Sequence, residues 1–290
     1  MVIDLVPALR ETARKALPRR TWDFLAFVRS ADCYYREDQA RRELFRQSQP
    51  LCDLKPHEEV IIAPPESCHV YDIWRSMAYS REGQRENRDF AKLVKHSQSF
   101  MDIGASAGWF SALFAGLRQN AQITSVEPDP NSFRCLEEVR EKNACAAVRW
   151  SLENVAVSDT PGSMELGLSE FGGDFSCTRM GTRPTTEVNV ETLSRLFAKY
   201  GTPDVLKIDV EGWEHRFLAD IIPTLALNHV RLHLEVHWEI CGREDWPTDK
   251  MCEAMLRAQP EVIYPARRSI EQLFSPSTER PAIQRCGLAF

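Results

Sequence analysis

A strand, a glycine turn and a helix near the middle of the chain constrain the fold most. Residues 100–108 read Phe-Met-Asp-Ile-Gly-Ala-Ser-Ala-Gly, and a second acidic residue, Glu127, follows in Val-Glu-Pro-Asp. Glycine tolerates the tight turn, and the free N–H groups of the helix that follows favour an anionic group. Glu127, at the end of the next strand, can accept two hydrogen bonds from a ribose diol. This layout is typical of a nucleoside-binding half-fold.

Details of the turn bear on which nucleoside would bind. A dinucleotide site would carry Gly-x-Gly-x-x-Gly, whereas this chain has Asp102-x-Gly104-x-x-x-Gly108. Asp102 would repel a pyrophosphate but attract a sulfonium or ammonium group, both of which S-adenosylmethionine carries. We expect the glycines to let a ligand approach the backbone, so Gly104→Val should block binding without unfolding the sheet. The alternative, that the turn is only a tight connection, stays open.

Bulk properties exclude several classes of protein. The chain has 290 residues and a formal net charge of -6, which disfavours nucleic acid as a main partner. Its nine cysteines form no Cys-x-x-Cys pair and no zinc spacing, as expected of reduced thiols in a cytoplasmic protein. Charged residues interrupt the first 30 residues, and we find no secretory or transmembrane segment.

The chain divides into two predicted regions. Residues 1–95 should form a helical N-terminal extension, in which Leu5, Leu9, Ala13 and Leu17 recur at helical spacing. This element could pack on the catalytic domain or on a second subunit, which leaves a homodimer open. It could instead contact a membrane surface or a lipid-linked substrate. Residues 96–290 should form the ligand-binding domain.

Strand and helix patterns alternate in the second region, which predicts an α/β fold with a mostly parallel sheet and helices on both faces. The predicted strands are 98–103, 122–127, 148–157, 163–168, 186–190, 204–209, 230–236 and 261–264. The predicted helices are 107–118, 131–143, 191–200, 213–225 and 248–258. Residues 169–184 are rich in Gly, Ser and Thr and should form a substrate lid. The last residues should form a polar tail that contains proline.

A second group of polar residues follows two later strands. Asp209 and Glu211 come where a buried strand gives way to a helix, and Glu235 and His237 alternate at the end of the next strand. Ligands of open α/β sheets bind outside the carboxyl ends of the strands. Methyl transfer to a hydroxyl requires removal of a proton, by a carboxylate, by a histidine near its ordinary pKa of about 6.5, or with help from a metal. These four residues are therefore the candidate catalytic residues.

Taken together, these segments resemble the FkbM-type S-adenosylmethionine-dependent methyltransferases. The matching segments are Met-Asp-Ile-Gly-Ala-Ser-Ala-Gly-Trp-Phe (101–110), Val-Glu-Pro-Asp-Pro (126–130), Glu-Asn-Val-Ala-Val-Ser-Asp (153–159), Val-Leu-Lys-Ile-Asp-Val-Glu-Gly-Trp-Glu (205–214) and Leu-Glu-Val-His (234–237). The resemblance implies a class I Rossmann-like fold with a seven-stranded sheet. It also implies O-methylation of hydroxyls on sugars or natural products. The sequence departs from the family pattern at Ser106, where asparagine is common, and at His215, where an aliphatic residue is common.

The resemblance also implies roles for individual residues. The turn with Asp102, Gly104, Ala105 and Gly108 would hold the methionine end of the cofactor. The remaining cofactor residues would be Glu127, Pro128 and Asp129 at the ribose, and Asn154 and Ala156 at the adenine. Asp209 and Glu211 would line the methyl-transfer site, with Glu235 and His237 opposite. A Mg²⁺ or Mn²⁺ ion held by Asp209, Glu235 and His237 is an alternative that we do not favour.

Three functions compete. The leading hypothesis is an S-adenosylmethionine-dependent O-methyltransferase that acts on a hydroxyl of a sugar, glycan or glycosylated natural product. An NAD-dependent sugar oxidoreductase or epimerase is disfavoured because the third glycine and a Tyr-x-x-x-Lys pair are missing. A non-catalytic nucleoside-binding scaffold is disfavoured by the clustered carboxylates and His237.

Overall fold

The chain forms two compact units, Met1–Pro50 and Leu51–Phe290, and the computed structural model describes most of the second. The described residues are 53–58, 60–65, 68–118, 120–167, 185–238, 248–265, 268–275 and 283–290. The predicted N-terminal helix and the predicted lid at 169–184 lie outside these residues.

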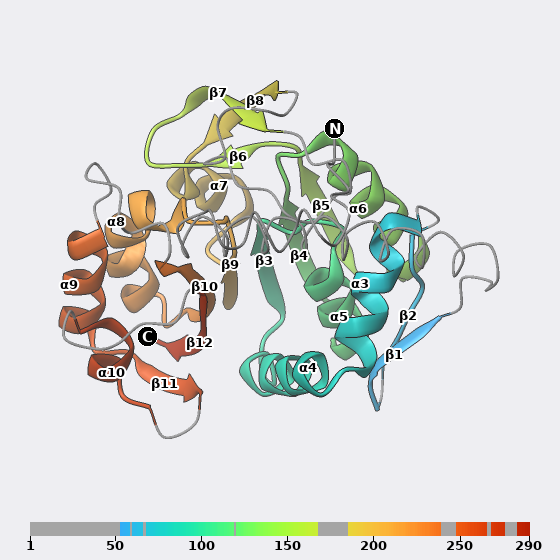
Figure 1. The fold of residues 1–290 in the computed structure, drawn as a ribbon, viewed down its shortest axis with the longest axis horizontal. Helices are drawn as coiled ribbons and strands as arrows, with labels where there is room; N and C mark the ends of the chain where they lie inside the picture. Colours follow the sequence, from blue (N-terminus) through green and yellow to red (C-terminus); the bar gives the residue numbers. More distant parts are fainter. Residues whose placement is uncertain are drawn as a thin grey trace, which may run out of the picture. The chain divides into compact units, whose positions relative to one another are not determined.

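A seven-stranded sheet forms the centre of the second unit, in the order β11-β12-β10-β9-β3-β4-β5 (Figure 1). Its strands are β3 (Ser99–Ile103), β4 (Gln122–Val126), β5 (Arg149–Glu153), β9 (Val205–Ile208), β10 (Arg231–His237), β11 (Glu261–Tyr264) and β12 (Ile283–Ala289). Strands β10, β9, β3, β4 and β5 pair in parallel, and β12 pairs antiparallel with both β10 and β11. The predicted Rossmann-like fold with a mostly parallel sheet is confirmed.

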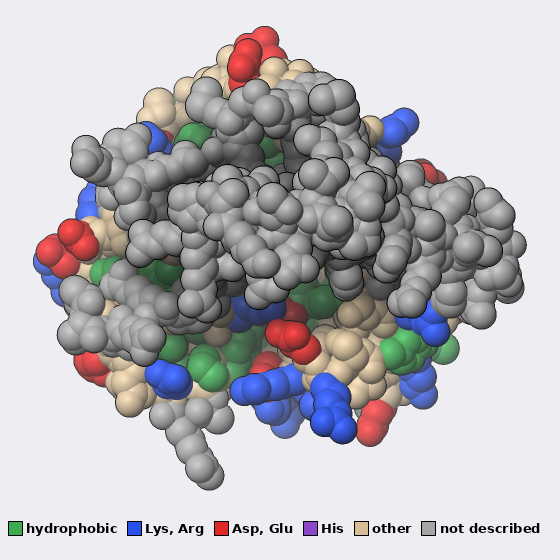
Figure 2. All heavy atoms as spheres, viewed as in Figure 1, with side chains coloured by type: hydrophobic (Ala, Val, Ile, Leu, Met, Phe, Trp, Pro, Cys, Tyr) green, Lys and Arg blue, Asp and Glu red, His purple; other side chains and the backbone are tan. Residues whose placement is uncertain are grey.

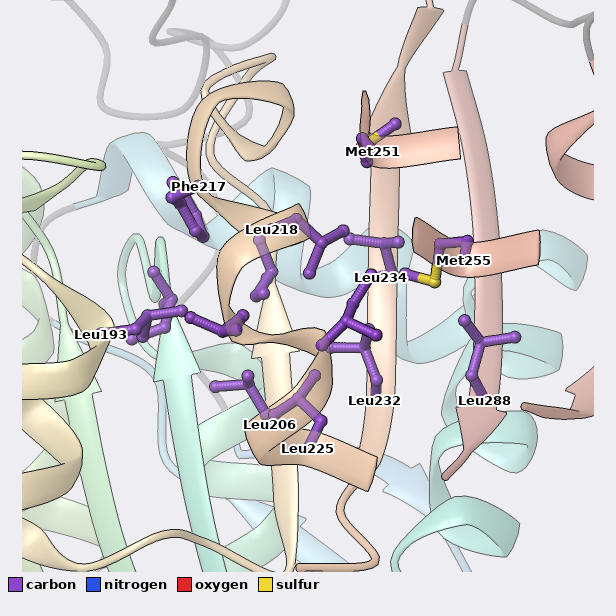
Figure 3. Close-up of a cluster of buried hydrophobic side chains, with 14 of the residues drawn as sticks. Leu193, Leu206, Phe217, Leu218, Leu225, Leu232, Leu234, Met251, Met255 and Leu288 are labelled. Carbon is purple, nitrogen blue, oxygen red and sulfur yellow. The ribbon is translucent and has the colours of Figure 1, made fainter. Parts of the chain in front are cut away.

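Helices cover both faces of this sheet, because its inner strands are apolar on both sides. One face carries α7 (Leu193–Tyr200), α8 (Glu214–Leu227), α9 (Thr248–Ala258) and α10 (Ile270–Phe274). Leucines of β9, β10 and β12 meet Phe217, Leu218 and Met255 there (Figure 3). The other face carries α3 (Cys68–Tyr79), α4 (Arg81–Leu93), α5 (Trp109–Leu117) and α6 (Pro130–Asn143). Its core includes Phe90, Phe100 and Phe114.

The predicted strand over residues 148–157 is wrong, because the chain changes sheets within it. Residues of β5 extend the large sheet, whereas β6 (Ala156–Val157) pairs in parallel with β8 (Thr185–Glu191). Strand β7 (Gly162–Gly167) pairs antiparallel with β8 and completes a three-stranded sheet in the order β6-β8-β7, so β7 does not form a hairpin with the strand before it. Asn154 and Val155 form the connection, and apolar patterning alone does not distinguish this break from a continuous strand.

The predicted polar tail is also wrong, because residues 283–289 form β12 between β10 and β11. Cys286 and Leu288 alternate with more polar residues and are fully buried, which gives this strand one apolar face. Gly287 makes room for the ring of Tyr264, since a Cβ there would lie 2.2 Å from its Cε1. Short strands with mixed polarity are difficult to recognise from sequence.

Residues 54–93, predicted to belong to the extension, pack on the α5 face of the sheet. Strands β1 (Leu54–His57) and β2 (Val60–Ile62) form an unpredicted hairpin, and Leu54, Val60 and Ile62 are buried in the same core as α5. These residues belong to the same compact unit, Leu51–Phe290, as the large sheet. Across the described residues, we find no helix both long and apolar enough to cross a bilayer.

Candidate functional site

A cavity lies beyond the carboxyl ends of β3, β4 and β9, and it encloses about 700 Å³ of empty space if the open solvent at its mouth is included. Its polar wall includes Ser106, Glu127, Asp209 and Glu211. Its apolar wall comes largely from the connection after β5 and from the small sheet: Val155, Ala156, Val157, Met164 and Leu166. The two groups of residues singled out in the sequence therefore meet in one cavity.

Contacts within the protein require glycine at two positions of the turn. Gly104 has a φ of +73°, and a Cβ there would lie 1.8 Å from the carbonyl oxygen of Asp209. Gly108 begins α5 with a φ of +89°, and a Cβ there would lie 2.6 Å from the side chain of Leu136. Gly104 lines the cavity, but both glycines are needed because other parts of the chain press against them.

Glu127 lies at the end of β4 with its carboxylate held in a fixed orientation. Its Oε2 accepts a hydrogen bond from the amide of Ser106 (2.7 Å), and its Oε1 accepts one from the amide of Asp129 (2.9 Å). Each oxygen has a further lone pair with which to accept a hydrogen bond. Burial raises the pKa of Glu127 to about 7, although the two backbone donors oppose this shift.

The neighbours of Glu127 support this loop. Asp129 caps α6, its Oδ1 accepting hydrogen bonds from the amides of Asn131 and Ser132. Asn154 donates from Nδ2 to the carbonyls of Glu127 (2.8 Å) and Pro128 (3.1 Å). Pro128 itself lines the cavity, whereas Asp129 and Asn154 fix the backbone behind it.

Lys207, to which the sequence analysis gave no role, links the two groups of residues. Its ammonium group is buried, donates to the carbonyl of Gly104 (3.1 Å), and lies 3.4 Å from carboxylate oxygens of both Asp102 and Asp209. Asp102 also accepts a hydrogen bond from Ser111 (2.6 Å). Asp102 is fully buried and does not line the cavity, so its contacts are with the protein.

Asp209, Glu211 and His237 come together at the ends of β9 and β10. The Nε2 of His237 lies 3.3 Å from Oε2 of Glu211 and 3.6 Å from Oε1 of Glu235. Burial alone would lower the pKa of His237, but Glu214, Glu211 and Asp209 outweigh it and raise that pKa to about 9. The value expected from the sequence was close to 6.5, so at neutral pH this imidazole carries a proton.

Asp209 ionises readily despite its environment. Burial opposes its ionisation, but the positive charges of Lys207, His237 and Arg285 outweigh burial and hold its pKa below the ordinary value. Glu211 has a φ of +52°, a left-handed conformation that is uncommon for a residue with a side chain. Such backbone strain is often found at functional sites.

Glu214, a second residue without a predicted role, is fully buried and joins the loop after β9 to the end of β10. Its Oε2 accepts a hydrogen bond from the amide of Gly212, and its Oε1 accepts one from the amide of His237, both at 2.8 Å. The same Oε1 lies 3.5 Å from Nδ1 of the His237 ring. Glu214 therefore fixes the backbone that carries Glu211 and His237.

Glu235 is neutralised by a residue far along the chain. Arg285 of β12 pairs with both of its oxygens, the contact from Nη2 to Oε1 measuring 3.2 Å. Arg285 Nε also lies 3.3 Å from Glu86 of α4. Acidic and basic side chains lie side by side on the molecular face shown in Figure 2. The contribution of Glu86 and Arg285 has no local sequence signal, since only the tertiary fold brings them to β10.

The structure thus divides the predicted site residues into two groups. Those that line the cavity are Gly104, Glu127, Pro128, Ala156, Asp209 and Glu211. Those that lie behind or beside it are Asp102, Ala105, Gly108, Asp129, Asn154, Glu235 and His237.

Comparisons with known structures give several similar folds at low identity. A methyltransferase FkbM from Methylobacillus flagellatus KT is 15% identical, with a TM-score of 0.43, over 67% of this chain and 44% of that one. A precorrin-6y C5,15-methyltransferase from Geobacter metallireducens GS-15 is 14% identical, with a TM-score of 0.39, over 71% and 88%. TYW2 from M. jannaschii in complex with AdoMet is 14% identical, with a TM-score of 0.37, over 73% and 75%. The chain spans less than half of the length of the first of these.

No curated protein matches the sequence. A family model described as the methyltransferase FkbM domain matches residues 102–261, which is more than half of the chain. This range begins at Asp102 and contains the glycine turn, Glu127, the whole of β9 and β10, and the cluster around His237. The chain therefore belongs to the FkbM methyltransferase family.

Proposed function

We propose that this protein is an S-adenosylmethionine-dependent O-methyltransferase that acts on a hydroxyl of a sugar, glycan or glycosylated natural product. The observation that carries the proposal is the single cavity that Glu127, at the end of β4, shares with Asp209 and Glu211, beyond the end of β9. A candidate nucleoside-binding residue and carboxylates suited to proton transfer thus line the same cavity. Membership of the FkbM methyltransferase family supports the same reaction.

The cofactor would lie along the ends of β3 and β4. Glu127 would accept hydrogen bonds from the ribose diol, because its carboxylate is oriented by Ser106 and Asp129 but retains free lone pairs. Ala156 and its apolar neighbours would contact the adenine. The backbone at Gly104 would face the methionine end, and the sulfonium would then lie on the side of Asp209 and Glu211, which line the same cavity.

The acceptor oxygen would attack the methyl carbon as its own proton leaves. The new O–C bond forms while the S–C bond breaks, and the sulfur keeps the electron pair to give S-adenosylhomocysteine. His237 is protonated at neutral pH, so it cannot take the proton there. Asp209 is a weak base because three cations stabilise its charge. We assign the proton to Glu211, which lines the cavity and is about one-third exposed.

Polyhydroxylated acceptors fit this end of the cavity best. Carboxylates accept hydrogen bonds from neighbouring hydroxyls, and Asp209 and Glu211 both line the cavity. These two side chains therefore offer acceptors to the hydroxyls of a sugar diol. A flat aromatic acceptor could not donate a comparable set of hydrogen bonds to them.

The test is transfer of a labelled methyl group from S-adenosylmethionine to a panel of free sugars, lipid-linked glycans, glycosylated natural products and their aglycones. We expect product only with acceptors that carry the sugar, methylated at oxygen by mass spectrometry. Glu211→Gln should lower kcat by roughly 10²–10⁴-fold, and the exposed Glu165→Gln should leave it unchanged. Calorimetric binding of NAD in preference to S-adenosylmethionine would refute the assignment.

A further inference from the structure

A histidine and two carboxylates converge beside the cavity in the arrangement of a metal site. One ligand atom from each of Asp209, Glu211 and His237 lies within 4.8 Å of the other two, and among the described residues this is the one such group. We propose that these three side chains bind a divalent cation with oxygen preference, Mn²⁺ or Mg²⁺, at the acceptor end of the cavity. The catalytic part of this inference rests on the proposed function.

The separations suit an octahedral ion after a small adjustment. Donors about 2.1 Å from a metal lie roughly 3 Å apart when adjacent and about 4.2 Å apart when opposite. The distance between Glu211 Oε2 and His237 Nε2, 3.3 Å, already fits an adjacent pair. The other separations are at most 4.8 Å, so Asp209 and Glu211 would move inward on metal binding. Glu211 can do so because its side chain is only partly buried.

Glu214 supplies the support that a metal-binding histidine requires. Metal-binding histidines generally hold their second ring nitrogen against a carboxylate or carbonyl, which orients the ring and leaves the other nitrogen for the ion. Oε1 of Glu214 lies 3.5 Å from Nδ1 of His237, and the imidazole is almost fully buried, with Nε2 toward Glu211. Among the described residues Nδ1 has no hydrogen-bond partner of normal geometry, so a slight rotation of the ring would complete this contact when the ion displaces the proton from Nε2.

This ligand set differs from the one suggested by the sequence, which included Glu235. Arg285 engages both oxygens of Glu235, and a carboxylate paired in this way has little charge left for an ion. Glu211 lies nearer to His237 Nε2 than Glu235 does, 3.3 Å against 3.6 Å, and it lines the cavity whereas Glu235 does not. We therefore assign Glu211, in place of Glu235, to the set of metal ligands.

A cation here would act on the acceptor. Three protein ligands leave positions for the oxygens of a vicinal diol, and coordination makes a hydroxyl easier to deprotonate. The acceptor proton would pass to the Glu211 oxygen that does not bind the ion, while the methyl group moves from sulfur to oxygen. A sugar with neighbouring hydroxyls would gain two coordination bonds that a single alcohol could not form.

The test is Mn²⁺ binding to the whole chain, which is first freed of metal with a chelator. Binding is measured as the loss of the EPR signal of free Mn²⁺. We expect one Mn²⁺ per chain. Glu211→Gln and Asp209→Asn should each weaken binding at least tenfold, and Glu214→Gln by roughly 10–100-fold. Glu235→Gln and the exposed Glu165→Gln should bind like the original protein. Circular dichroism checks the folding of each variant. If Asp209→Asn fails to fold, the Mn²⁺ affinity of Glu211→Gln, at a more exposed position, decides whether the site exists.

Absence of saturable Mn²⁺ binding, or equal binding by Glu211→Gln, would overturn the site and leave protonated His237 as the cation among the carboxylates. Equal losses in Glu235→Gln and Glu211→Gln would overturn the assigned ligand set. S-adenosylmethionine binding, measured by calorimetry on the same samples, separates this inference from the proposed function. Cofactor binding without Mn²⁺ binding would contradict only the metal site, whereas Mn²⁺ binding without cofactor binding would contradict only the proposed function.

Discussion

The backbone of Gly104 lies against the carbonyl oxygen of Asp209, so closely that a Cβ on Gly104 would fall 1.8 Å from that oxygen. The turn after β3 and the residue after β9 are therefore packed backbone to backbone. Lys207 reinforces the contact by donating to the carbonyl of Gly104 and approaching the carboxylate of Asp209. The glycine turn and the candidate catalytic carboxylate are thus held directly against each other.

The first prediction follows from this contact. Gly104→Ala, and still more Gly104→Val, should destabilise the folded protein by about 3 kcal/mol or more, because a strained φ adds to a backbone collision. The expectation that Gly104→Val only blocks the ligand is thereby revised. The measurement is denaturant unfolding, with Gly201→Ala as control, since Gly201 also has a positive φ but no atom within 4 Å of an added Cβ. Equal effects of the two alanine substitutions would contradict the packing argument.

The second prediction concerns the ribose contact. Glu127→Gln keeps the size of the side chain but removes the carboxylate, and leaving a buried donor without its partner costs roughly 1–3 kcal/mol. We expect S-adenosylmethionine to bind about tenfold more weakly or worse by calorimetry, with thermal unfolding as the check on folding. Glu165→Gln, on the exposed part of β7, is the matched control. A folded Glu127→Gln protein with full affinity would remove Glu127 from the site.

The third prediction is a pH dependence. Burial raises the pKa of Glu127 to about 7, so the folded protein without ligand holds a proton that the unfolded chain has lost. The free energy of unfolding from this group therefore falls as the pH rises from about 5 to 7. Ligand hydroxyls prefer the ionised form, so cofactor affinity should rise between pH 6 and 8 and then level off. Calorimetry between pH 6 and 8 should show this rise in cofactor affinity for the original protein but not for Glu127→Gln.

The fourth prediction addresses Lys207. Lys207→Met removes the cation between two buried carboxylates, and breaking such a pair typically costs about 3–5 kcal/mol. The loss in free energy of unfolding should be largest near pH 7. It should be smaller in acid, where Asp102 and Asp209 can take up protons. Denaturant unfolding at several pH values measures this. The control is Lys199→Met, whose ammonium group is exposed beside Glu153, and it should shift the unfolding midpoint far less.

Much of the fold could be predicted because each element has a local cause. Thr192 and Asp129 cap helices that begin within two residues of the predicted starts, and β9 is buried on both faces. The glycine turn after β3 and the acid after β4 could be located for the same reason. The break between β5 and β6 escaped prediction because residues 148–157 contain neither glycine nor proline to mark the change of sheet.

The site could be predicted only in part, because its charges are balanced by residues distant in sequence. Glu235 and His237 are recognisable at the end of a strand, but their ionisation depends on Arg285 and Glu214. No spacing rule places β12 beside β10. The sequence therefore locates the candidate groups, whereas the tertiary structure decides which of them carries a proton and which is neutralised.

The position of β12 has a consequence for biosynthesis. Arg285, which neutralises Glu235, is carried by a strand inserted between two strands that are both translated earlier. A nascent chain ending after β11 would hold Glu235 in the sheet without its counter-ion and would leave β11 with no strand to pair with. Domains generally fold as units during synthesis. Nearly all of this domain must therefore be synthesised before Arg285 can pair with Glu235.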